Sequence, residues 1–136
     1  MAERERRLDE EHKLLSAVFP GIIRSGDWFL IPDDARAVRA GWSPSPFPVA
    51  FHAQQNHPGQ VPYGIYIARD ARTNGQVPNN FNANSGQRPP FEGQWGVLSW
   101  QADSQGVPWI PMERIQEGAN LLNFAITFQE RFNEGV

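Results

Sequence analysis

The sequence of 136 residues contains no cysteine. This absence excludes disulfide-stapled scaffolds, thiolate zinc sites, iron–sulfur clusters and thiol nucleophiles. Long hydrophobic runs are also missing, because no segment reaches the roughly 18 consecutive apolar residues that a membrane helix needs. The N-terminal stretch is densely charged and lacks the apolar core of a signal peptide. We therefore expect a cytoplasmic protein that does not contact a membrane.

Lysine is scarce as well. Lysine occurs once, at Lys13, and the formal net charge is −3, so we expect no nucleic-acid partner. Apolar residues make up 40% and charged residues 20% of the chain, as is typical of globular proteins. A chain of this length suffices for one domain, which we expect to span residues 1–136. Glycine and proline each number 12, which predicts few helices and much turn and loop.

Hydrophobic spacing predicts the elements of an α+β fold. Residues 3–19 lack glycine and proline, and their apolar residues recur at helical spacing, which predicts a helix that ends at Pro20. Apolar spacing also predicts a final helix over residues 112–134, in which Gly118 is a local weakness. The expected core face of this helix consists of Ile115, Leu122, Ala125, Ile126, Phe128 and Phe132. Strands are expected over residues 22–32, 49–54, 63–68 and 95–100, and a long loop over residues 70–94. Helices should therefore pack on one side of an antiparallel sheet.

The first helix carries an arginine cluster, which consists of Arg4, Arg6 and Arg7. Five nearby acidic residues offset its charge. We interpret the cluster as a solvated helical face, and a surface that docks a partner is the alternative.

The five tryptophans divide into two groups by their sequence neighbours. Trp28 and Trp109 are expected in the core. Trp42, Trp95 and Trp100 flank segments rich in proline and glycine, where core packing competes with a role as interface anchors.

Polar loop residues and histidines are weaker candidates for ligand-binding or metal-binding residues. Asn79 and Asn80 could hydrogen-bond a peptide or a sugar, or simply form the loop. His12 is expected at the surface of the first helix. His52 and His57 are spaced as two zinc ligands can be, but the chain offers no third ligand nearby except Asp70 or Glu92. We therefore predict no metal site and no cofactor.

Three stretches of the chain resemble the ubiquitin-conjugating-enzyme superfamily, which includes catalytically dead variants and RWD domains. Residues 51–67, FHAQQNHPGQVPYGIYI, resemble a strand, the proline bend of the family and the next strand. Residues 98–111, LSWQADSQGVPWIP, resemble the active-site stretch and the Trp-x-Pro that follows it. Residues 121–132 resemble the next helix. Trp95, Ser99, Trp100 and Trp109 are also similar in spacing to a bacterial ubiquitin-conjugating-like group.

This resemblance implies an N-terminal helix, a four-stranded antiparallel meander, a long active-site-like loop and a C-terminal helix. It also implies partners, namely a ubiquitin-like protein, an activating-enzyme-like protein and a system that includes a JAB-type peptidase. By analogy, the first helix would dock the activating enzyme, and the stretch from Trp95 to Trp109 with the long loop would receive the C-terminal tail of the modifier.

The departures from the family decide the expected activity. The family holds its modifier as a thioester on a cysteine, and this chain has none. The His-Pro-Asn motif has no clean counterpart, since Pro78 is followed by Asn79 but not preceded by histidine. Ser99 lies near the position of the family's nucleophile, and Ser104 and Asp103 lie in the same window. A serine would need a base to accept its proton.

We therefore expect a ubiquitin-conjugating-like protein of a bacterial ubiquitin-like modification system that binds its partners without holding a thioester. One alternative is a true conjugating enzyme, either with its cysteine replaced by Ala or Ser or with a serine oxyester on Ser99 or Ser104, for which Asp103, His52 and His57 are candidate bases. The other is a peptide- or glycan-binding module that uses exposed tryptophans and the Asn-rich loop. The sequence favours a non-catalytic variant over a transferase.

Overall fold

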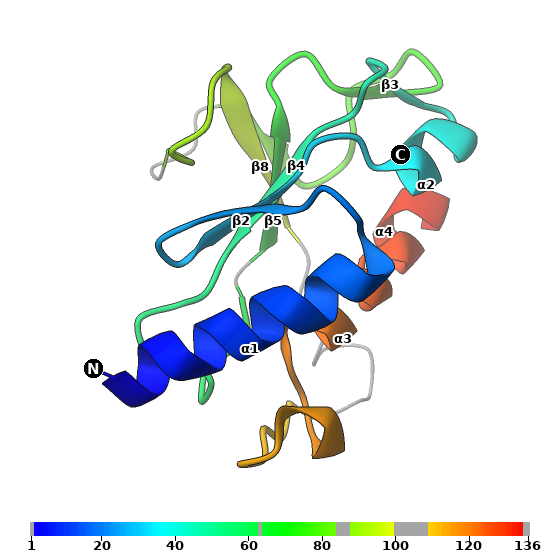
Figure 1. Ribbon diagram of the computed structural model, residues 1–136. Helices are drawn as coiled ribbons and strands as arrows, with labels where there is room; N and C mark the ends of the chain where they lie inside the picture. The colour runs from blue at the N-terminus through cyan, green and yellow to red at the C-terminus, as the bar shows by residue number, and fades with distance from the viewer. Residues whose placement is uncertain (1, 63, 84–87, 100–108, 135–136) are drawn as a thin grey trace.

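An N-terminal helix, an antiparallel sheet and short C-terminal helices follow one another in the computed structural model, which describes residues 2–62, 64–83, 88–99 and 109–134 (Figure 1). The helical elements are α1 (Ala2–Val18), α2 (Ala35–Arg39), the 3-10 turn η2 (Ile115–Glu117), α3 (Leu121–Thr127) and α4 (Gln129–Glu134). The strands are β1 (Ile23–Ser25), β2 (Trp28–Ile31), β3 (Trp42–Ser43), β4 (Val49–His52), β5 (Gly64–Ala68), β6 (Arg72–Thr73), β7 (Phe81–Asn82) and β8 (Trp95–Ser99). The predicted α+β class is confirmed.

The main sheet has six strands in the order β1-β2-β4-β5-β8-β7, and β3 and β6 form a separate pair. All pairs are antiparallel. The expected count of four strands is therefore wrong, for two physical reasons. The predicted strand over residues 22–32 folds back on itself at Gly26, whose φ of 63° suits a tight turn. The predicted loop over residues 70–94 also contributes β6 and β7, which are too short to show a period.

The strands alternate between two faces, and one face carries the main core. Figure 1 shows α1, α3 and α4 beside the sheet, and their apolar side chains bury this face. From the sheet, the core takes Phe29, Ile31, Val49, Phe51, Ile65, Ile67 and Leu98. From the helices and the residue between α3 and α4, it takes Leu8, Leu15, Leu121, Phe124, Ala125, Phe128 and Phe132.

The other face of the sheet carries a smaller aromatic cluster. Ala50, Tyr66 and Trp95 are buried there, and half-buried apolar residues pack against them. The ring of Trp28 stacks on His52 with centroids 4.4 Å apart and meets Tyr66 edge-on at 5.0 Å. This cluster lies over β4, β5 and β8, and the last of these strands begins at Trp95 and ends at Ser99.

The predicted C-terminal helix over residues 112–134 is interrupted. Gly118 has extended backbone angles (φ −147°, ψ −165°), and the chain becomes helical again only after Asn120. The side chain of Asn120 accepts from the backbone N–H of Asn123 at 2.9 Å, and the Asn123 side chain accepts from the Asn120 N–H at 3.1 Å. This reciprocal cap starts α3. Ile126, expected on the core face, is 47% exposed.

The structure describes four of the five tryptophans. Trp42 is buried, and its indole N–H donates to the carbonyl oxygen of Phe132 at 2.9 Å. Trp95 is buried as well, whereas Trp28 and Trp109, which were expected in the core, are half-buried. Core packing, one of the two interpretations of Trp42 and Trp95, is therefore confirmed, whereas Trp28 and Trp109 pack against the apolar clusters from half-buried positions.

Two further features concern the helices. His12, expected at the surface, is half-buried, and its Nε2 lies 3.3 Å from the carbonyl oxygen of Ile22.

Among the described residues, no helix is long and apolar enough to cross a membrane.

Candidate functional site

Ser99 and Asn80, both candidates from the sequence, lie side by side at one end of the sheet. The backbone N–H of Ser99 donates to the carbonyl oxygen of Asn80 at 3.0 Å, and Ser99 pairs with Gly64 on the other side. Both Ser99 and Asn80 are exposed. Asn80 has a positive φ of 55°, which turns the chain into β7. The other candidates of this stretch, Trp100, Asp103 and Ser104, lie outside the described residues.

Neither candidate histidine is placed to act as a base for Ser99. His52 lies on the same face, but β5 separates β4 from β8, so the two backbones are about 10 Å apart. His52 is also stacked on Trp28, and its Nε2 lies 3.1 Å from Oδ1 of Asp27. The side chain of His57 is fully buried elsewhere. Within the described part of the chain, Ser99 is therefore an exposed hydroxyl without a base.

The arginines of α1 have three different environments. Arg4 donates to the carbonyl oxygens of residues 53–54 at 3.3 and 3.0 Å, which ties the helix to the end of β4. Arg6 is exposed and forms ion pairs with Glu3 at 2.8 Å and Glu10 at 2.5 Å. The hydrogen bond from Arg6 lowers the pKa of the Glu3 carboxyl. The predicted solvated face is thus confirmed for Arg6 and is wrong for Arg7, which is buried.

Arg7 belongs to a buried polar junction centred on Glu11. One carboxylate oxygen of Glu11 lies 2.5 Å from Nε2 of His57 and 3.2 Å from Nε of Arg7. The other oxygen accepts from the backbone N–H of Leu121, at the start of α3, at 2.7 Å. The Glu11 side chain is fully buried. It therefore connects α1, the bend around His57 and the first turn of α3, a role that the sequence did not reveal.

Two stretches that are far apart in the sequence meet beside this junction. The indole N–H of Trp109 donates to the carbonyl oxygen of Pro58 at 2.8 Å. A hollow of about 360 Å³ lies next to them, lined by Pro58, His57 and the N-terminal part of α1. The bend around Pro58, the residues at Trp109 and the first helix therefore form one continuous region of the molecule.

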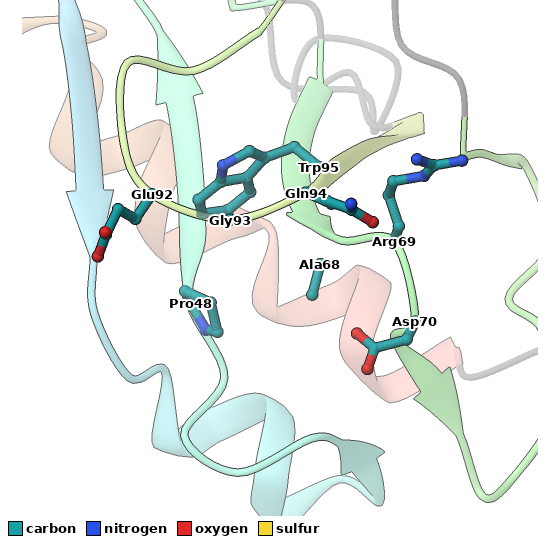
Figure 2. Close-up of a pocket in the computed structure, with 8 residues that line it drawn as sticks. All are labelled: Pro48, Ala68, Arg69, Asp70, Glu92, Gly93, Gln94 and Trp95. Atoms are coloured by element: carbon teal, nitrogen blue, oxygen red, sulfur yellow. The ribbon is translucent and has the colours of Figure 1, made fainter.

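A second hollow, of about 290 Å³, lies where β4 begins, β5 ends and β8 begins (Figure 2). Its apolar wall consists of Pro48, Ala68 and the ring of Trp95. Asp70 and Glu92 lie on opposite sides of it in Figure 2. Sequence reasoning had considered both residues only as weak metal ligands, because the pairing that joins their loops could not be foreseen.

Asn79 is fixed by the C-terminal helix. Its carbonyl oxygen accepts from the guanidinium of Arg131, which also lies over the ring of Trp42, 5.6 Å from the ring centroid. Burial lowers the pKa of Arg131. Asn79 therefore has a structural role through its backbone, while its exposed side chain remains available.

In comparisons with known proteins, no family model, curated protein or solved structure matches the chain.

Proposed function

We propose that this chain is a cysteine-less ubiquitin-conjugating-like protein of a bacterial ubiquitin-like modification system. It binds the ubiquitin-like modifier, the activating-enzyme homologue or both, and it holds no thioester. The order of a helix, an antiparallel sheet and C-terminal helices supports this proposal at the level of architecture. The absence of cysteine from the sequence separates it from conjugating enzymes that use a thiol.

The observation that carries the proposal is the hydrogen bond from Trp109 to Pro58. These residues lie 51 positions apart, in two stretches that resemble the family independently. Their direct contact brings the two stretches together, which supports the proposal. The buried Glu11–His57 pair adds support, because it fixes the same bend to the first helix.

A binding role also agrees better with Ser99 than a transferase role does. Its hydroxyl is exposed, and among the described residues no histidine or carboxylate contacts it. An unactivated serine is a weak nucleophile. The exposed side chains of Ser99 and Asn80 can still contact an extended peptide tail through hydrogen bonds.

The proposal is tested by calorimetric titration of the full chain with a ubiquitin-like protein and an activating-enzyme homologue from the same organism. We expect a dissociation constant below about 100 µM with at least one of them. Arg6→Glu, on the exposed face of α1, should weaken binding to the activating protein several-fold. Glu130→Lys in α4, also an exposed charge reversal, serves as the matched control and should leave it unchanged. No binding to either protein at that concentration would refute the proposal.

A further inference from the structure

We draw no further inference here: the strongest candidate, the exposed apolar surface of the neighbouring helices α1 and α3 at Val18 and Ile126, carries none, because nothing in the part of the chain that the structure describes shows what covers it.

Discussion

Glu11 and His57, both with fully buried side chains, contact each other at 2.5 Å between a carboxylate oxygen and Nε2. The same carboxylate receives the first N–H of α3, from Leu121. Replacing Glu11 by alanine would leave the imidazole and this N–H without their acceptor in the protein interior. It would also remove the carboxylate that pairs with the buried guanidinium of Arg7, whose other nitrogens donate to the carbonyl oxygens of Met112 and Ala119. Because unpaired buried charge is costly, we expect Glu11→Ala to lower the free energy of unfolding by about 3–5 kcal/mol, measured by urea denaturation.

The matched control is Glu5→Ala on the same helix. Glu5 also pairs with an arginine, Arg24, at 2.8 Å, but its side chain is 61% exposed. Exposed ion pairs contribute about 0–1 kcal/mol, so this variant should unfold close to the parent. Similar losses for both variants would contradict the assignment of Glu11 as the junction of α1, the bend and α3.

Asn120→Ala tests the interruption of the C-terminal helix. The Asn120 side chain caps α3, and its amide also donates to the carbonyl oxygen of Ile115 at 2.6 Å. Loss of an N-cap costs about 0.5–2 kcal/mol, and we expect a value near the upper end because Asn120 is buried. Asn133→Ala, at an exposed position of α4, should cost less than about 0.5 kcal/mol. If the helix were continuous from residue 112, the two losses would be similar.

Periodicity predicted what depends on neighbours in sequence. Leu8 and Leu15 are buried as their helical spacing indicates, and Ile65 and Ile67 share the core face of β5 as strand alternation requires. What failed depends on distant partners. Two-residue strands such as β7 exist only because β8 supplies their hydrogen bonds, and no local pattern marks them.

The candidate site was likewise predictable only where it depends on neighbours in the sequence. The sequence identified Ser99, Asn80 and Trp95 as candidates, but it could not tell that Asn80 lies beside Ser99 or that Trp95 lines a hollow with Asp70 and Glu92. It missed Glu11 altogether, because a charged residue on an amphipathic helix normally faces solvent. Glu11 accepts a hydrogen bond from the N-terminus of α3, which is far away in the sequence, so no local sequence pattern marks this role.

Gly96→Ala tests the edge pair of β7 and β8. A Cβ atom at Gly96 would lie 2.6 Å from the ring of Phe81 and 2.8 Å from the carbonyl oxygen of Asn82. This overpacking should lower the unfolding free energy by about 1–3 kcal/mol. Phe81→Leu should relieve part of the clash, so the double variant should lose less than the two single losses added together. Strict additivity in the denaturation data would show that β7 does not lie against Gly96.

Ser99→Cys tests whether the exposed end of β8 corresponds to the thioester position of the family. Ser99 is exposed, so a thiol there would be accessible to an activated modifier, and a thiol is a far better nucleophile than a hydroxyl. We expect the variant, incubated with the modifier, the activating protein and ATP, to gain a covalent adduct that thiol reductants cleave, detected by mass spectrometry. Ser43→Cys, at an exposed position in β3, is the control and should gain none. An adduct on the parent chain that Ser99→Ala removes would instead identify a serine oxyester. If neither the parent nor Ser99→Cys forms an adduct, Ser99 does not correspond to the thioester position.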